Sequence, residues 1–397
     1  MAEFLFVLYL FSGLVKQLFT YNPTLNLPID FTGITIVFLI LWAIAKHKTL
    51  SFNINKRSFG IIISFLAFWG WILFSMTYTT SAGPAISKSV LMATNFIPIL
   101  FLSIYQRFNI NLFLRIFGCA ISVAALIFLP LFFFLLSSGY GAEMRTFIGG
   151  YLSIGLYLGL ICITNLTSRK FKLINGQWNI YINFTFLAIM LALGARGPLV
   201  ILVFCYLLYL FHSLTPKNIF TIKKNHLFPI VWAAISCILL LIVINLYTDG
   251  AIELLINRTI GRILSMGEDN SSLEREDFIV KSLQIIFASP KNFLFGTGIG
   301  SFVQECYGYD EVGSPHNIIL EVWLELGLVG IILIGILFYL LFSGTTKKYY
   351  VSGFVVLYIF LNLMKSHSLP ELRIPFTFFF LYSSTFNTKK QLYQVSY

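Results

Sequence analysis

Long apolar stretches, interrupted by short polar connections, run through most of the chain. A helix needs about 20 apolar residues to cross the hydrocarbon core of a bilayer. On that template the sequence predicts twelve membrane-spanning helices, at approximately 4–20, 28–45, 59–79, 85–105, 112–137, 147–166, 178–194, 197–213, 227–247, 316–342, 349–364 and 373–387.

The connection between residues 248 and 315 is the long polar one, and we expect it to lie outside the membrane. Its first part, 252–264, has helical periodicity and places Arg258 and Arg262 one turn apart. A capping box at Ser271 starts a second predicted helix that ends before Pro290. The sequence therefore predicts an N-terminal transmembrane bundle (1–247), a large helical loop (248–315) and C-terminal transmembrane helices (316–397).

The loop ends in the glycine-rich segment Gly296-Thr-Gly-Ile-Gly300. A single GxG is a weak signal for a phosphate-binding turn, and no predicted strand precedes it as a dinucleotide fold requires. Of the two interpretations, we favour a flexible turn over a phosphate cradle.

Composition agrees with a protein whose solvent is lipid. Of 397 residues, 58% are apolar and 11% charged, whereas soluble domains carry about 25% charged residues. The 42 Phe, 20 Tyr and 6 Trp suit lipid-facing helices and interfacial belts. The five cysteines are odd in number and form no CxxC pair, which argues against a disulfide framework or a structural zinc site. The predicted fold class is an all-α integral membrane protein.

The net charge of +11 follows membrane topology rather than a nucleic-acid surface. Sixteen Lys and Arg residues, from Lys46 to Lys390, lie in alternate connections and the C-terminal tail, which contain no Asp or Glu. The opposite connections hold most of the acidic residues. The positive-inside rule therefore places both termini in the cytoplasm. The first apolar stretch lacks a cleavage site, and we expect it to be retained as a helix.

A histidine stands at the start of the tenth predicted helix. Pro315 favours a turn or a helix start, so that His316 would occupy the first helical turn. Free backbone N–H groups and the positive end of the helix dipole disfavour an imidazolium there. A neutral imidazole beside a water-filled cleft suits a general base. The alternative is a histidine that only caps the helix or lies in the membrane interface.

Two carboxylates follow on the same helix. Glu321 and Glu325 lie one turn apart, up to about 13 Å from His316 at 1.5 Å per residue. Carboxylates in such a position are costly unless they face a cavity or a partner, and we expect them to support a polar cavity rather than to catalyse. Lys16 and Lys88, within the first four apolar stretches, can extend toward the lipid headgroups.

Two arginines on the outer side are candidates for binding an anion. Arg196 lies in the tight turn Gly194–Pro198 between two apolar stretches, where a planar guanidinium suits phosphate oxygens. The alternative is a side chain that extends to lipid headgroups. Arg275 has acidic neighbours, and this context taken alone favours a surface ion pair.

Three motifs together resemble the bacterial O-antigen ligase and polymerase superfamily. His316-Asn317, nine residues and then Gly327-Leu-Val-Gly330 resemble its HN-x9-GxxG signature, and Ala195–Leu199 resembles its Arg-Gly motif. The segment 275–302 resembles its outer loop, with an arginine, a helix, a proline and a glycine-rich turn. The resemblance covers about residues 190–335, and upstream helices match in topology alone.

The resemblance implies a GT-C-like fold and a metal-independent glycosyltransferase without a cofactor. Its donor would be an undecaprenyl-diphosphate-linked oligosaccharide at the periplasmic face of the bacterial inner membrane. His316 would be the base that deprotonates an acceptor sugar hydroxyl, and Arg196 and Arg275 would bind the donor diphosphate. Arg262 is added on its position in the loop, and Asn317, Gly327 and Gly330 are motif residues of structural role.

The expected reaction is a direct displacement at the anomeric carbon with inversion. The sequence has no Asp-x-Asp near the outer face, so the arginines would take the part that a divalent ion plays elsewhere. We expect the large loop to form a lid over a site bounded by Arg196, Arg275 and His316.

Polymerase and ligase share donor and motif and differ in acceptor, which is a lipid-linked repeat unit for one and lipid A-core for the other. We favour the polymerase, because polymerases are the more varied group, and keep the ligase as the alternative. A flippase or other transporter is a third hypothesis, but it would need binding groups near the middle of the membrane. A chain-length regulator is a further expected partner, and nucleic acid is not expected.

Overall fold

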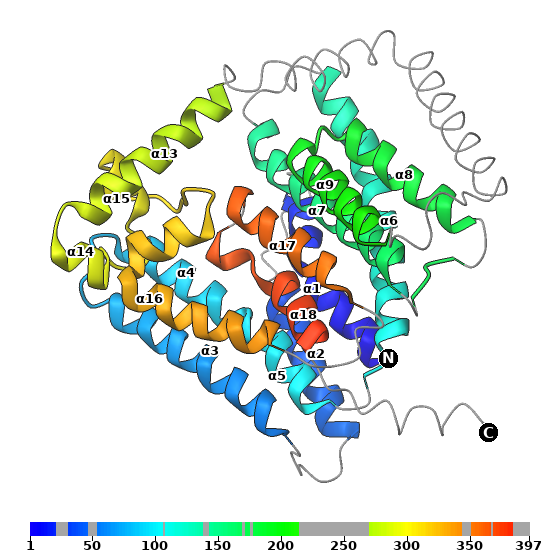
Figure 1. The fold of residues 1–397 in the computed structure, drawn as a ribbon, viewed down its shortest axis with the longest axis horizontal. Coiled ribbons are helices and arrows are strands. Elements are labelled where there is room, and N and C mark those ends of the chain that lie inside the picture. The colour runs from blue at the N-terminus through cyan, green and yellow to red at the C-terminus, as the bar shows by residue number, and fades with distance from the viewer. Residues whose placement is uncertain are drawn as a thin grey trace. The chain divides into compact units, whose positions relative to one another are not determined.

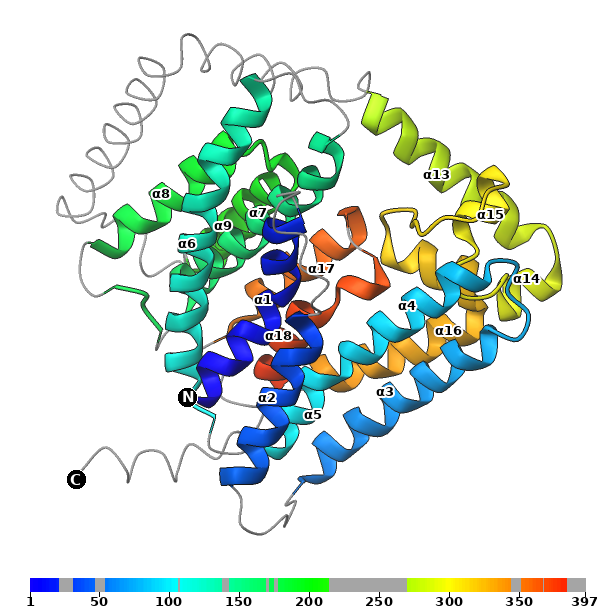
Figure 2. The same ribbon diagram turned by 180° about the vertical axis from the view of Figure 1, so that it is seen from behind.

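A computed structural model describes residues 1–20, 31–46, 54–105, 108–137, 143–168, 171–174, 178–213, 270–343, 351–366 and 368–383. Within these residues the chain forms helices and no β-strand (Figures 1 and 2). This part of the chain confirms the predicted all-α fold class.

Helices occupy eleven of the twelve predicted membrane-spanning segments, and the remaining one, 227–247, lies outside the described residues. The helices in those segments are α1 (Ala2–Thr20), α2 (Phe31–Lys46), α3 (Lys56–Ser75), α4 (Ala82–Thr94), α5 (Phe96–Ile104), α6 (Ile110–Ser137), α7 (Glu143–Thr167), α8 (Trp178–Ala192), α9 (Arg196–Ser213), α16 (Ile318–Phe342), α17 (Gly353–Ser366) and α18 (Arg373–Ser383). The predicted helix 85–105 is divided at Asn95 into α4 and α5. Pro98 explains this division, because it has no N–H to donate to the carbonyl of Thr94.

Four of the described helical segments are long and apolar enough to cross a membrane: Lys56–Ser75, Ala82–Ile104, Ile110–Leu129 and Ile318–Phe342. Five shorter apolar helices accompany them. Their outward faces carry large apolar side chains, such as Ile63 and Leu66 on α3. Such faces are costly in water and stable in lipid. The chain is therefore a multi-pass helical membrane protein.

The chain divides into two compact units. Unit 1 comprises residues 1–47, 109–266 and 349–358, and unit 2 comprises residues 48–108, 267–348 and 359–397. This grouping by contacts is separate from the division by membrane topology that the sequence predicts, which stays a prediction.

Unit 1 is a bundle in which α1 packs against α2 and α6, and α7 packs against α6, α8 and α9. Rings of Phe6 and Phe11 on α1 contact Phe113 and Phe117 on α6, at centroid distances of 5.8 and 5.0 Å. Asn165 of α7 donates a hydrogen bond to Asn183 of α8 at 2.9 Å.

Unit 2 is built around the pair α3 and α16, which lie side by side in both views (Figures 1 and 2). Arg57 donates from Nη2 to the Leu340 carbonyl at 2.7 Å, near one end of the pair. The helices of the loop before α16 all pack against α16: α13 (Asn270–Phe287), α14 (Pro290–Phe295) and α15 (Phe302–Tyr307). The 3-10 turn η4 (Leu369–Glu371) packs against α4 and α16.

Helix α16 is broken at Gly327, the first glycine of the GxxG motif. This residue has φ 68° and ψ −169°, a conformation essentially restricted to glycine. A Cβ atom here would overlap the backbone of Leu294 in α14. A Cβ atom at Gly330, the other motif glycine, would overlap the side chain of Leu326. Gly327 therefore allows the break in α16, and both glycines allow the close packing around it.

The glycine-rich turn 296–300 supplies hydrogen bonds that the break removes from α16. The backbone N–H groups of Thr297 and Gly298 donate to the carbonyl oxygens of Leu324 and Glu325, both at 2.9 Å. Unpaired carbonyls are costly in apolar surroundings. The broken helix therefore depends on the turn, and the turn is held in place by the broken helix.

Two contacts from α3 complete this arrangement. Trp71 donates from Nε1 to the carbonyl of Leu326 at 2.9 Å, and Ser75 Oγ accepts a hydrogen bond from the Ile299 N–H at 3.2 Å. Successive N–H groups of the turn are thus bonded within the protein. The turn is a packed structural element, and neither the flexible turn nor the phosphate cradle considered from the sequence describes it.

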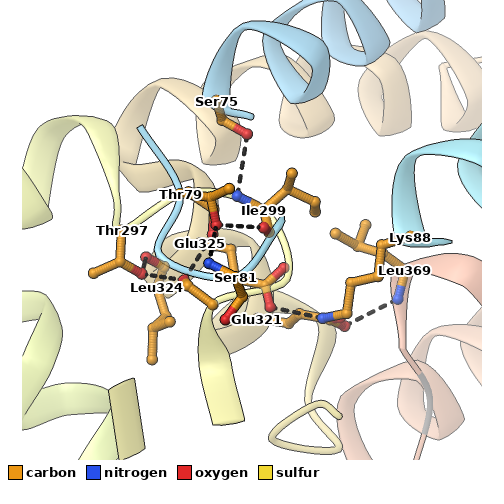
Figure 3. A network of polar contacts seen from close by, with 12 residues as sticks. Ser75, Thr79, Ser81, Lys88, Thr297, Ile299, Glu321, Leu324, Glu325 and Leu369 are labelled. Atoms are coloured by element: carbon orange, nitrogen blue, oxygen red, sulfur yellow. Dashed lines mark hydrogen bonds and ion pairs between the residues drawn. The ribbon is translucent and has the colours of Figure 1, made fainter. Parts of the chain in front are cut away.

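A buried ion cluster, which we call the Lys88 cluster, joins α4 to α16. Lys88 Nζ lies 2.7 Å from Glu321 Oε1 and 2.6 Å from Glu325 Oε1, and these three side chains are at most 1% exposed (Figure 3). Glu321 Oε2 accepts from the Leu369 N–H at 2.9 Å. Both carboxylates face Lys88 as a partner rather than a polar cavity, and Lys88 does not extend toward the headgroups.

Gly327→Ala is expected to destabilise the detergent-solubilised protein by about 3 kcal/mol or more. The added methyl group overlaps the α14 backbone, and an alanine backbone is strained at this positive φ. Gly335→Ala is the matched control, since a Cβ there meets no atom within 4 Å. Helix propensity predicts that this control is unchanged or stabilised by up to about 1 kcal/mol. Denaturant unfolding followed by circular dichroism measures both, and equal midpoints would contradict the role of Gly327.

Lys88→Met is expected to cost about 3–5 kcal/mol of stability, because it leaves two buried carboxylates without their counter-ion. The triple variant Lys88→Met, Glu321→Gln, Glu325→Leu removes the charges together and keeps an acceptor for the Leu369 N–H. It should recover most of the loss. If the single variant unfolds at the wild-type denaturant concentration, the cluster does not stabilise unit 2.

Candidate functional site

His316 lies on the loop between α15 and α16, directly before the helix cap. Asn317 is the N-cap of α16, and its Oδ1 accepts from the N–H groups of Ile319 and Leu320 at 3.0 and 3.1 Å. The helix begins at Ile318, so the prediction that His316 occupies the first helical turn is wrong. Because the asparagine takes the first-turn N–H groups, the imidazole is left outside the helix.

The backbone of His316 is strained. With φ 55°, it is the one non-glycine residue of positive φ in the part of the chain that the structure describes. This conformation is uncommon for residues with a Cβ atom, and such strain gathers at functional sites. The residue is exposed. The loop therefore holds the His316 imidazole at the surface of unit 2, on a backbone of positive φ.

An apolar core fixes the elements around this histidine. The rings of Phe278 on α13 and His316 lie 6.0 Å apart between centroids. Phe278 also makes edge contacts with Phe302 and Tyr307 of α15, at 5.6 and 6.0 Å. Beneath them a buried cluster contains Ile286, Phe302, Val303 and Leu324. This packing fastens α13 and α15 to the first half of α16.

Arg275 lies on α13, one helical turn before Phe278, so that both share a face of the helix. It is half-buried, and its guanidinium makes no hydrogen bond or ion pair with any residue that the structure describes. The surface ion pair that its acidic neighbours favour is therefore not formed. A guanidinium that is unpaired among the described residues, on the helix whose Phe278 ring contacts His316, suits an anionic ligand.

Asp277, the acidic residue two positions after Arg275, has partners of its own. Asp277 pairs with Lys281 at 2.9 Å and accepts a hydrogen bond from the Tyr307 hydroxyl at 3.0 Å. The hydrogen bond from Lys281 lowers the pKa of Asp277. Burial and the hydrogen bond to Asp277 raise the pKa of Tyr307. Lys281 Nζ also lies 4.1 Å from the centroid of the Tyr307 ring. These three groups satisfy one another and hold α13 against α15.

Arg196 is the first residue of α9 and belongs to unit 1. Gly194 before it has φ 70°, the left-handed conformation that ends many helices. Pro198 lies in the first turn of α9, as the sequence predicts. Gly155 of α7 approaches the turn so closely that a Cβ there would overlap Ala195. Neighbouring helices therefore fix the backbone at Arg196, whose side chain is half-buried.

The structure thus brings Arg275 and His316 into one unit, on elements joined by Phe278. Arg196 belongs to the other unit, and Arg262 lies outside the described residues. The motif residues Asn317 and Gly327 have defined roles in unit 2, as the cap and the break of α16.

Among the described residues, we find neither a reactive thiol nor a metal-binding cluster near His316. Cys306 of α15 is half-buried, and burial raises the pKa of its thiol to about 12. It is therefore protonated at neutral pH and unsuited as a nucleophile. Across the described ranges, no group of three His, Cys, Asp or Glu side chains could hold a metal ion.

Sequence reasoning missed the Lys88 cluster, which lies in the same unit and on the same helix. The signal was present as one lysine within the predicted helix 85–105 and two glutamates one turn apart near the start of 316–342. Buried charges of opposite sign must find one another in apolar surroundings. A charge count over the predicted helices could therefore have paired them.

Comparison with known proteins places a family domain over these residues. Residues 181–335 match a family model described as O-antigen ligase, and the match includes Arg196, Arg275 and His316. No curated protein and no solved structure matches the chain. Members of the matched family are glycosyltransferases of the O-antigen ligase and polymerase type. Over residues 181–335 the chain is therefore similar to the O-antigen ligase family, whose members transfer lipid-linked glycans.

Proposed function

We propose that the protein is an O-antigen polymerase, which transfers an undecaprenyl-diphosphate-linked glycan to a lipid-linked repeat unit. One observation carries this proposal: an exposed histidine, held at positive φ and followed by the cap of α16, lies inside the matched domain. Strain of this kind points to a functional role rather than to packing.

In the proposed reaction His316 is the general base. Its imidazole takes the proton of an acceptor sugar hydroxyl while that oxygen forms a bond to the anomeric carbon of the donor. The bond between the anomeric carbon and the diphosphate oxygen breaks, and the glycan is transferred with inversion. A positioned base of this type contributes about 10²- to 10⁴-fold to the rate.

The charge that develops on the leaving diphosphate needs cationic partners. Of the three proposed arginines, Arg275 has the most support. It has no partner among the described residues, and it lies one helical turn from Phe278, whose ring contacts His316. Arg196 and Arg262 are proposed on the sequence alone. Preorganised guanidinium groups stabilise such charge in the transition state, and the reaction proposed here uses no metal ion or cofactor.

The proposed orientation follows the distribution of charge. Lys and Arg fill alternate connections that contain no acidic residue, so we place both termini in the cytoplasm and the His316 end of α16 in the periplasm. The proposed location is the bacterial inner membrane, and a chain-length regulator is a proposed partner.

The ligase, which delivers the glycan to lipid A-core, is the alternative, and the description of the matched family favours it. A flippase is less well supported. The acidic residues of α16 that would suit a transported solute are paired with Lys88 instead. The acceptor therefore decides between the two remaining functions.

His316→Ala is expected to lower glycan transfer at least about 100-fold, because the acceptor hydroxyl loses its base. Arg196→Ala and Arg275→Ala should abolish the product as well, and Glu325→Gln should have a milder effect. The measurement is a gel of lipopolysaccharide from a deletion strain carrying each variant, with membrane abundance followed by immunoblot.

His212→Ala is the matched control, since this histidine lies at the end of α9 against Phe354 and has no proposed role. In the deletion strain, a single repeat unit on the core indicates a lost polymerase, and a bare core indicates a lost ligase. Full-length glycan chains in the His316→Ala strain would refute the base, and a full-length ladder in the deletion strain would refute both functions.

Asn317→Ala is expected to cost about 1 kcal/mol of stability, because two first-turn N–H groups lose their acceptor, and to lower transfer through the displaced His316. Asn317→Asp keeps the acceptor oxygen and should restore both properties. The unfolding midpoint in detergent and the lipopolysaccharide gel test this pair. An alanine variant as active and as stable as the wild type would show that the cap does not position the histidine.

A further inference from the structure

Large apolar side chains are exposed around α14, outside the helices that cross the membrane. Phe287 at the end of α13 is 61% exposed, Phe295 at the end of α14 is 44% exposed, and Leu294 beside it is similarly open. Phe74, in the last turn of α3, is 55% exposed. Large apolar side chains exposed on helices that pack together are typical of an interaction site rather than of a water-facing loop.

Aromatic contacts join Phe295 to the end of α3, and the Phe287 ring lies 5.7 Å from the ring of Phe293 on α14. Trp71 lies 5.3 Å from Phe74 and 6.2 Å from Phe295 between ring centroids. Tyr78 donates its hydroxyl to the Phe295 carbonyl at 2.7 Å, and Lys291 Nζ lies 5.9 Å from the Tyr78 ring. Trp, Tyr and a lysine whose stem covers an apolar surface are typical of the membrane interface.

The level of α14 along the membrane-spanning helices also matches the interface. Helix α3 has 20 residues and is therefore about 30 Å long, the thickness of the hydrocarbon core. Its last residue, Ser75, accepts a hydrogen bond from the N–H of Ile299, in the glycine-rich turn that follows α14. The loop backbone at 296–299 thus meets α3 where the hydrocarbon ends.

Exposed apolar residues lie both on α14 and on the outward face of α3, and the contact between the Trp71 and Phe295 rings connects the two. Leu73 and Phe74 belong to the same face as Ile63 and Leu66, further along the helix. Lipid covers that face of a membrane-spanning helix. This connection favours lipid, rather than another protein surface, as the cover of Phe287 and Phe295.

We propose that α14 and the adjoining end of α13 are seated in the outer part of the bilayer, with phospholipid acyl chains against Phe287, Leu294 and Phe295. This half of the outer loop is then a membrane anchor rather than part of a movable lid. The inference does not depend on the proposed transfer reaction.

Site-directed spin labelling tests the anchor in lipid nanodiscs of phosphatidylethanolamine and phosphatidylglycerol. Single-cysteine variants Phe287→Cys, Leu294→Cys and Phe295→Cys are made in a full-length background in which all five native cysteines are replaced. Ile63→Cys on α3 is the lipid reference, and Val312→Cys, exposed on the loop before His316, is the water reference.

Collision rates with oxygen and with a water-soluble nickel chelate are then compared. We expect labels at 287, 294 and 295 to behave like the label at 63, with high oxygen and low nickel accessibility, and unlike the label at 312. High nickel accessibility would place α14 in water and overturn the anchor. Low accessibility to both reagents would mean that protein covers it, from the rest of the chain or a second copy, and would overturn the proposal equally. Three labelled positions keep the test decisive if one variant fails to fold.

Discussion

Three carbonyl groups in the middle of an apolar helix determine much of unit 2. The break at Gly327 removes their usual partners, and in surroundings without water each unpaired carbonyl would cost several kcal/mol. Their donors come from the glycine-rich turn and from Trp71 of α3. The glycine-rich turn is therefore tied to α16 and α3 by hydrogen bonds, which bridge the break in α16. The strained histidine stands at the far end of this fixed segment.

The Lys88 cluster strengthens the same segment from the opposite side. It joins α4 to α16 between the cap at Asn317 and the break at Gly327, and through Glu321 it also holds the backbone of η4. A buried ion cluster stabilises little compared with an apolar core, but it penalises any arrangement that separates its members. The first half of α16 is thus fixed by a cap, an ion cluster and a hydrogen-bonded turn, which together present His316.

Hydropathy was sufficient to place the helices, because lipid demands long apolar segments whatever the tertiary packing. The HN-x9-GxxG spacing likewise located the candidate base and both glycines. It could not show that Asn317, and not His316, caps the helix, since either residue can precede a first turn. Nor could it reveal the break, because the conformation of Gly327 is imposed by Leu294 and the turn behind it, some thirty residues away in the chain. Lys88 was misinterpreted for the same reason: its partners lie more than two hundred positions further along.

The order of these partners along the chain has a consequence for biogenesis. Trp71, Thr297 and Gly298, which donate across the break, all precede the carbonyls of residues 324–326 that they serve. During synthesis from the N-terminus, the donors are therefore complete before the interrupted helix leaves the ribosome. Helix α16, whose carbonyls at the break need donors from elsewhere, would therefore enter the bilayer beside segments that already carry those donors. The η4 turn, whose Leu369 N–H bonds to Glu321, and α18, which packs against α5 and α16, are made after the helix, so the completion of unit 2 awaits the last part of the chain.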